Sequence, residues 1–374
     1  MDRNRFVVCV LTGILATGVL ETGCRQGASG TVTVGAIAPL TGQGAEYGKW
    51  AQRGVDLALE EVNKAGSAVQ HKVVWEDSQL SPTKAVSALL KLADNDRVPL
   101  ILGPLTSGET IPCVPKAGEK GVVILSPTAT SDKLVDPGQF FFRVCPTNRV
   151  QADAAAKFCR ETLKANSVYV LYEEIAYGTD LAGAFVERFE ALGGRVLARD
   201  SFREGTTEYR PAIQKIRAAK PDVIYLPSNY TEAGTFLRQL AQLGVKKNVV
   251  GGDGSYGKEL IDIAGEAAEG TYWTTIAWGT GEDKAVAESF KQRYQVSYGE
   301  PPHQFAALYY DAARLAFQAV SRPGMSGKDV RTALLNLPPF HGATGTTKFT
   351  GKGQVEKSFA VYVVKSGKFE QVEP

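Results

Sequence analysis

Two neighbouring apolar runs of the sequence both end in small and hydroxylated residues. The run at 98–102 (VPLIL) leads into GPLTSGET at 103–110, and the run at 122–125 (VVIL) leads into SPTATS at 126–131. If both runs are strands of a parallel sheet, the clusters lie where ligands bind and where helix N-termini attract anions. Hydroxyl groups donate hydrogen bonds without adding charge, so together the clusters predict a carboxylate site. Either cluster alone would fit a capped turn.

A complementary set of residues follows strand-like runs in the second half of the sequence. Tyr177 follows VLYEEIA, Tyr230 follows VIYLPSN and Asp253 follows NVVGG. An acidic residue and aromatic residues that face hydroxyl groups across a cleft would suit a zwitterion, with its carboxylate on one side and its ammonium on the other. Asp253 lies between glycines and also fits an ordinary turn. The two sets together favour a ligand site between two parts of the chain.

The elements that would position these residues alternate between strands and helices from residue 31 onward. Short, near-continuous apolar runs bounded by turn residues predict strands of a parallel sheet that is covered on both faces. Helical patterns include 109–120 and 150–166, and the tail at 345–372 has the pattern of short strands with glycine turns. A second series of similar length begins near residue 148. The sequence therefore predicts an α/β protein of two lobes.

The composition is that of an ordinary globular protein with room for two domains. The chain has 374 residues, of which 44% are hydrophobic and 22% charged, and its formal net charge is +2. Nucleic acid is not expected as a partner, because no cluster of Lys and Arg with aromatic residues occurs. The three histidines are isolated, so no metal centre and no cofactor are expected. Cys113, Cys145 and Cys159 have no metal or CxxC spacing and are expected to be structural.

The N-terminus predicts export. Arg3 and Arg5 precede a 15-residue apolar run at 6–20, which is short for a membrane span and suits a signal peptide. The LETGC that follows looks like a bacterial lipoprotein signal, in which residues 1–23 are removed and Cys24 carries the lipid. A glutamate three places before Cys24 departs from that pattern, where an aliphatic residue is usual. Ordinary signal cleavage nearby is the alternative.

Two enzymatic interpretations are rejected, because the sequence lacks residues that their motifs require. The stretch GDGSYGKE at 252–259 resembles a phosphate-binding loop, but Lys258 is followed by Glu259 in place of the Ser or Thr that binds Mg²⁺. A serine hydrolase needs its nucleophile in a G-x-S-x-G turn, and Ser107 lacks the first glycine of that motif. No histidine is evident as a base for Ser107. We therefore expect a binding protein that is not an enzyme.

Several segments of the chain, taken in order, resemble one family. They are GAIAPLTGQGAEYGKWAQRGVDLALEEVNKAG at 35–66, then ILGPLTSGET, ILSPTATSDKL, AYGTDLAGAF, AGTFLRQLAQLG and DIAGEAAEGTY. As a set they resemble the periplasmic branched-chain amino-acid binding proteins of ABC importers, over about residues 31–370. The resemblance implies the type I periplasmic binding-protein fold, in which two doubly wound parallel-sheet lobes are joined by three crossovers and close on the ligand by a hinge.

The resemblance also implies how the chain is divided and what it binds. The N-terminal lobe would comprise residues 31–147 and 277–359, and the C-terminal lobe residues 148–276 and 360–374. A small amino acid, branched-chain or otherwise apolar or aromatic, would be delivered to an ABC permease in the inner membrane. The protein would be a monomer in the periplasm or on the outer face of the cytoplasmic membrane, held there only by its lipid. The alternative is a sensor of the same fold for an amide or an aromatic acid, not linked to uptake.

The binding residues of the family fall on matching positions of this sequence. The site for the α-carboxylate falls on the hydroxyls of Ser107 and Thr130 and on the backbone of Thr128. Asp253 aligns with the acidic ligand of the α-ammonium. The remaining implied contacts are aromatic residues of the far lobe and of the side-chain pocket, namely Tyr177, Tyr230, Tyr47 and Phe305.

Three positions depart from the pattern of the leucine-type members of the family. Asp253 is shorter than the glutamate expected there. Thr106 stands where those members carry a disulfide-forming cysteine, and Thr128 replaces a small apolar residue. The two additional hydroxyls argue against a strictly aliphatic ligand. Leu105 and Ala129 complete the set of expected pocket residues.

Overall fold

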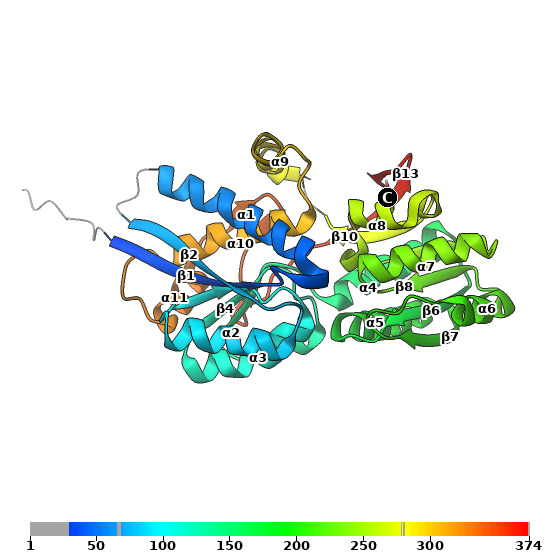
Figure 1. Cartoon of the computed structure of the whole chain (residues 1–374), viewed down its shortest axis with the longest axis horizontal. Helices are drawn as coiled ribbons and strands as arrows, with labels where there is room; N and C mark the ends of the chain where they lie inside the picture. Colours follow the sequence, from blue (N-terminus) through cyan, green and yellow to red (C-terminus); the bar gives the residue numbers. More distant parts are fainter. Residues whose placement is uncertain (1–29, 66–68, 278, 280, 373–374) are drawn as a thin grey trace, which may run out of the picture.

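Two lobes lie side by side in the computed structural model, each with a central sheet between helices (Figure 1). The structure describes residues 30–65, 69–277, 279 and 281–372. The signal peptide expected over residues 1–23 and the lipid-bearing Cys24 lie outside the described residues. We call the lobe built on β1 to β5 lobe 1 and the lobe built on β6 to β10 lobe 2.

Lobe 1 is built on a five-stranded parallel sheet of order β2-β1-β3-β4-β5. Alternate residues of a strand face opposite sides of the sheet, so Leu100 and Leu102 pack with α1 and α10 whereas Ile101 packs with α2 and α3. Its strands are β1 (Gly30–Ala38), β2 (Val69–Asp77), β3 (Leu100–Leu102), β4 (Val123–Ser126) and β5 (Phe141–Arg143), and a small hairpin adds β11 (Phe340–Gly342) and β12 (Gly345–Thr347). Its helices are α1 (Ala45–Lys64), α2 (Pro82–Asp94), α3 (Ser107–Lys120), α9 (Lys284–Tyr298), α10 (Gln304–Ala319) and α11 (Gly327–Asn336).

Lobe 2 repeats the strand order of lobe 1. Its parallel strands run β7-β6-β8-β9-β10, and two antiparallel strands extend the sheet beyond β10. The strands are β6 (Ser167–Glu173), β7 (Arg195–Phe202), β8 (Val223–Leu226), β9 (Asn248–Gly251), β10 (Tyr272–Ile276), β13 (Phe359–Lys365) and β14 (Lys368–Gln371). The helices are α4 (Asn148–Lys157), α5 (Ala176–Ala191), α6 (Arg210–Ala219), α7 (Tyr230–Gln242) and α8 (Lys258–Ala264).

The chain passes between the two lobes three times: after β5, after β10 and after β12. Hydrogen bonds connect these passages to one another. The Arg143 N–H donates to the Gly353 carbonyl (3.0 Å), and Arg143 Nε donates to Gln354 Oε1 (2.6 Å). The Ala277 N–H donates to the Ser358 carbonyl (2.9 Å). The predicted fold of two doubly wound lobes with three crossovers is confirmed.

Two predicted helices differ from the observed ones at their ends. The helix expected over 109–120 begins earlier, at Ser107, because Thr106 caps it: Thr106 Oγ1 accepts from the Glu109 N–H and the Glu109 carboxylate accepts from the Thr106 N–H. The helix expected over 150–166 does not continue as one α-helix, because α4 ends at Lys157 and a single π-turn follows over Phe158–Thr162.

All three cysteines of the described residues are buried and free. Cys113 lies on α3 in lobe 1, Cys145 in the first passage between the lobes and Cys159 in the π-turn of lobe 2. Burial raises the pKa of the Cys113 and Cys145 thiols to about 12, and burial also raises the pKa of Cys159. These thiols therefore pack as small apolar side chains.

Helices α1 and α10 approach closely at Gly54, which provides a test of the packing in lobe 1. A Cβ at this position would lie 2.1 Å from the Ala306 carbonyl oxygen of α10, so Gly54→Ala should lower the free energy of unfolding by about 1–3 kcal/mol. Gly183→Ala on α5 is the control, because the nearest atom to its Cβ would be Arg199 Nη2 at 3.7 Å. That variant should be neutral or more stable by about 0.5–1 kcal/mol. Urea unfolding of both variants measures the difference, and equal stabilities would contradict this description of the α1–α10 contact.

Candidate functional site

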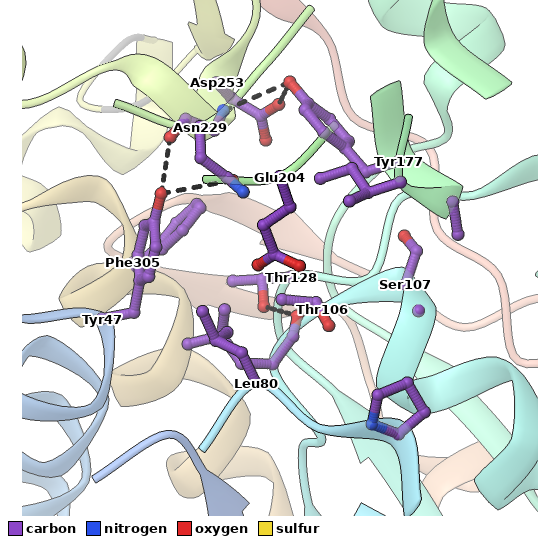
Figure 2. Close-up of a pocket in the computed structure, with 16 residues that line it drawn as sticks. Tyr47, Leu80, Thr106, Ser107, Thr128, Tyr177, Glu204, Asn229, Asp253 and Phe305 are labelled. Carbon is purple, nitrogen blue, oxygen red and sulfur yellow. Dashed lines mark hydrogen bonds between the residues drawn. The ribbon is translucent and has the colours of Figure 1, made fainter. Parts of the chain in front are cut away.

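A cavity of about 240 Å³ lies between the lobes, at the carboxyl ends of the strands of both sheets (Figure 2). Lobe 1 contributes the segments that follow β2, β3 and β4 together with α1 and α10, and lobe 2 contributes those that follow β6, β7, β8 and β9. This is the edge at which open parallel sheets bind ligands. The lining residues are Tyr47, Leu80, Pro82, Leu105, Thr106, Ser107, Gly108, Thr128, Ile175, Ala176, Tyr177, Glu204, Asn229, Asp253, Gly254 and Phe305.

Most residues expected from the sequence line this cavity, and three do not. Ala129 and Thr130 are buried behind the lobe 1 wall. Tyr230 packs against Tyr47, with ring centroids 4.9 Å apart, and the preceding Asn229 lines the cavity in its place. The expected residues that do line the cavity are Tyr47, Leu105, Thr106, Ser107, Thr128, Tyr177, Asp253 and Phe305.

The wall from lobe 1 consists of the N-terminus of α3 and nearby hydroxyl groups. The N–H groups of Ser107 and Gly108 lie in the first turn of α3, which has no preceding turn to supply carbonyl partners. Ser107 Oγ accepts from the Ser131 N–H (3.2 Å) and keeps its own proton for another acceptor. Among the described residues, the buried Thr130 Oγ1 has no hydrogen-bond partner. Neutral donors at a helix N-terminus favour an anion on this side of the cavity.

Thr128 does not project its hydroxyl as a free donor. Its Oγ1 donates to the Leu105 carbonyl (2.5 Å), so this hydroxyl ties the segment after β4 to the segment after β3. Thr106 is likewise occupied, because it caps α3. The hydroxyls of Thr106 and Thr128 therefore fix the shape of the cavity wall and are not free to donate to a ligand.

The wall from lobe 2 contains the buried carboxylate of Asp253, whose exposure is 6%. Its Oδ1 accepts hydrogen bonds from the Tyr177 hydroxyl (2.8 Å) and from Gln151 Nε2 (2.9 Å). Both bonds end on Oδ1, so Oδ2 has no side-chain donor within the described residues. Burial raises the pKa of the Asp253 carboxyl, and the two hydrogen bonds oppose that effect. A cation in the cavity would supply the missing countercharge.

Further carboxylates surround the segment after β8. Glu173 accepts from the Asn229 N–H (2.8 Å), and burial together with the charge of Glu232 raises the pKa of Glu173 to about 8. Burial also raises the pKa of Glu232. Glu204 lies nearer to solvent and lines the cavity itself. Lobe 2 therefore presents an acidic edge to the cavity, whereas lobe 1 presents neutral donors.

Direct contacts across the cavity hold the two lobes together. The Tyr47 hydroxyl of lobe 1 donates to the Gly254 carbonyl of lobe 2 (2.8 Å), and Figure 2 shows it beside Asn229. On the other side, Asp180 of lobe 2 accepts from Ser131 Oγ (2.8 Å) and from the Asp132 N–H (2.7 Å). Ser131 also donates to Ser107, so the proposed anion wall is joined to this contact between the lobes.

Three of the lining residues that the sequence analysis missed share one position in the fold. Leu80 follows β2, Glu204 follows β7 and Asn229 follows β8. Leu80 has a left-handed backbone, with φ of 58°, which turns the chain toward the cavity. Considering the segment after every parallel strand, and not only those rich in hydroxyls, would have found all three.

None of the described histidines lines the cavity. His303 stacks on Trp50, with ring centroids 3.7 Å apart, and burial lowers the pKa of its imidazole to about 3. His71 and His341 lie elsewhere in lobe 1 and have hydrogen-bond partners of their own. No group of three or more His, Cys, Asp or Glu side chains in the described part of the chain is placed to hold a metal ion. The described helices include none that is both long enough and apolar enough to cross a bilayer.

Known proteins are similar in sequence to this chain along most of its length. The family model described as periplasmic binding protein matches residues 31–368. The Leu/Ile/Val-binding protein BraC3 of Rhizobium johnstonii is 30% identical over 371 residues, which cover 97% of this chain and 100% of that protein.

Two solved structures agree with this result. The leucine binding protein LivK of Thermotoga maritima has a TM-score of 0.86 at 30% identity, over 91% of this chain and 98% of that one. The branched-chain amino acid transporter substrate binding protein LivJ of Streptococcus pneumoniae, in complex with isoleucine, has a TM-score of 0.85 at 30% identity, over 92% and 100% of the two chains. The resemblance found in the sequence is confirmed, and the chain belongs to the periplasmic binding protein family.

Proposed function

We propose that this protein is a non-enzymatic receptor that binds a small amino acid between its two lobes and delivers it to an ABC permease. The names of its relatives support this proposal, since BraC3 is a Leu/Ile/Val-binding protein and LivJ was solved with isoleucine. Membership of the periplasmic binding protein family implies a location outside the cytoplasm.

The observation that carries the proposal is the opposite chemistry of the two walls. Lobe 1 offers the N-terminus of α3 and the hydroxyl of Ser107, which suit a carboxylate. Lobe 2 offers Asp253, a buried carboxylate that hydrogen bonds only partly satisfy, which suits an ammonium. A free α-amino acid carries both groups on one carbon atom and can therefore bridge the two walls.

The dimensions and lining of the cavity support a single small ligand. Its volume of about 240 Å³ lies below the range of roughly 300–1,000 Å³ that is typical of sites for drug-sized molecules. Leu80, Leu105, Ile175 and Phe305 supply apolar surface for a side chain. We assign the α-carboxylate to Ser107 and the backbone of Thr128, with the hydroxyl of Thr130 behind this wall and without a hydrogen-bond partner among the described residues. We assign the α-ammonium to Asp253, with Tyr177 beside it.

The remaining parts of the proposal concern the chain as a whole. Residues 31–147 and 277–359 would move as one lobe and residues 148–276 and 360–374 as the other, closing on the amino acid as a monomer. Removal of residues 1–23 would leave Cys24 as the lipid-bearing first residue of the mature protein. The permease would then receive the amino acid from a receptor that is held at the membrane surface.

The lipid anchor can be tested by mass spectrometry of the membrane fraction. We expect a mature N-terminal peptide that begins at Cys24 and carries diacylglycerol. The Cys24→Ser variant should lose the lipid and leave the membrane fraction, while keeping its affinity for the amino acid, because Cys24 precedes the first strand. A mature N-terminus at another residue would contradict the anchor and would leave export unaffected.

Ser107→Ala should weaken the binding of leucine by about 1.5–3 kcal/mol, since the hydroxyl is assigned as a donor to a charged carboxylate. Isothermal calorimetry measures this as a rise in Kd of roughly tenfold or more. Ser87→Ala is the matched control, because Ser87 is an exposed serine of α2 whose hydroxyl donates to the Thr83 carbonyl. Unchanged affinity in Ser107→Ala would refute the assignment of the carboxylate.

Asp253→Asn distinguishes an amino acid from a simple carboxylate. The amide keeps the shape of the side chain and removes its charge, so the ammonium of leucine would be buried without a counterion at a cost of several kcal/mol. The deaminated analogue 4-methylpentanoate has no ammonium, and its affinity should stay the same or improve. Calorimetry with both compounds on both proteins provides the comparison. Equal losses for the two compounds would show that Asp253 does not bind the ammonium.

A further inference from the structure

We propose that Glu204 makes this pocket selective for amino acids whose side chain ends in a cation. The inference rests on the proposed function, because it assumes that the α-carboxylate and the α-ammonium occupy the two walls described above. It concerns the remaining part of the ligand, the side chain, and names the class of amino acid that the pocket prefers.

The charged side chains that line the cavity are all negative. Among its lining residues are two carboxylates, Asp253 and Glu204, and no Lys, Arg or His. A zwitterionic amino acid brings one ammonium for Asp253 and one carboxylate for the N-terminus of α3. If the side chain of the amino acid is aliphatic, the ligand has no further charged group to pair with Glu204.

Glu204 also has no counterion among the described residues. Within the described residues its carboxylate forms no ion pair and no hydrogen bond, whereas Asp253 accepts two. Two further carboxylates lie close enough to feel its charge: Glu204 contributes to the raised pKa values of both Glu173 and Glu232. A cation near Glu204 would therefore be attracted by several carboxylates at once.

The loop that carries Glu204 is held in place against the cavity. The N–H of the next residue, Gly205, donates to Glu232 Oε1 (3.1 Å), and Gln43 of lobe 1 donates to the same oxygen (3.4 Å). Gly205 has a φ of 75°, which a glycine adopts without strain. Glu232 thus connects the loop to lobe 1 while the lobes are together.

The position of Glu204 relative to Asp253 defines the path of a side chain. Figure 2 shows the Glu204 carboxylate directed toward Thr106 and Thr128 of lobe 1, on the side away from Asp253. Leu80 and Phe305 supply apolar surface along the same cavity. An amino acid with its ammonium at Asp253 could therefore place a methylene stem on the apolar residues and a terminal cation at Glu204.

Norleucine and ornithine form a matched pair of ligands for testing whether Glu204 recognises a terminal cation. Both have an unbranched side chain of the same length, which ends in a methyl group in norleucine and in an ammonium in ornithine. Calorimetry at low ionic strength should give a Kd for ornithine about tenfold below that for norleucine in the wild-type protein. The preference should shrink as salt is added, because Glu204 is exposed to solvent.

Glu204→Gln should abolish the preference for ornithine. The affinity for ornithine should fall, and the affinity for norleucine should stay the same or rise. Glu208→Gln is the matched control, because it removes the same charge four residues along the same segment, at a residue that does not line the cavity. This control should keep the preference of the wild type. Retained binding of norleucine shows that each variant is folded.

The outcomes separate this inference from the proposed function. If norleucine binds the wild type as tightly as ornithine or more tightly, or if Glu204→Gln leaves the ratio unchanged, the role of Glu204 is wrong and amino-acid binding stands. If neither compound binds, and leucine does not bind either, the proposed function fails together with the inference.

Discussion

Asp253 is a carboxylate held almost out of water, and the arrangement of the cleft depends on how its burial is compensated. Within the described residues, its three side-chain partners come from three different elements: Gln151 from α4, Tyr177 from α5 and, through the Asp253 backbone carbonyl, Gln304 from α10. Helix α10 belongs to lobe 1, so the loop that carries the charge is fixed by both lobes. A buried carboxylate without such partners would take up a proton and lose its attraction for a cation. The polar network of the cleft thus opposes the protonation of Asp253 that burial favours.

The two lobes share one strand order but differ in the chemistry of the edge that each presents. In both sheets the strand order reverses between the first and third strands, β1 and β3 in lobe 1 and β6 and β8 in lobe 2. This reversal leaves a crevice at the same place in each lobe. In lobe 1 this edge carries hydroxyls and the N-terminus of α3, and in lobe 2 it carries Glu204, Asp253 and the buried Glu173. A dipolar molecule between these edges therefore has one favoured orientation. The fold shared by the two lobes sets the position of the crevice, and a few residues in the loops set the difference in charge between its two edges.

The sequence predicted the fold well because alternating strand and helix patterns report burial directly. It also predicted the loops of Ser107 and Asp253, since the carboxyl end of a strand can be located without knowing its neighbours. It did not distinguish Tyr230 from Asn229: a helix begins at this point, and the direction of a side chain there depends on tertiary packing. Glu204 could not be recognised either, because a charged residue in a loop is ordinary until the opposite wall is known. The hydroxyl of Thr128 was expected to argue against a strictly aliphatic ligand, and only the structure shows its bond to the Leu105 carbonyl.

The three buried thiols have a consequence for how the protein can be followed as it unfolds. A thiol reacts as its thiolate, and burial both shields these sulfurs and disfavours the charged form. Chemical modification therefore has to wait until the surrounding structure opens. Cys113 responds to the opening of lobe 1, Cys159 to that of lobe 2 and Cys145 to that of the first connection between them. The chain thus carries one buried thiol in each lobe and one in the connection between them. The rates at which the three thiols are labelled would report the order in which these regions unfold.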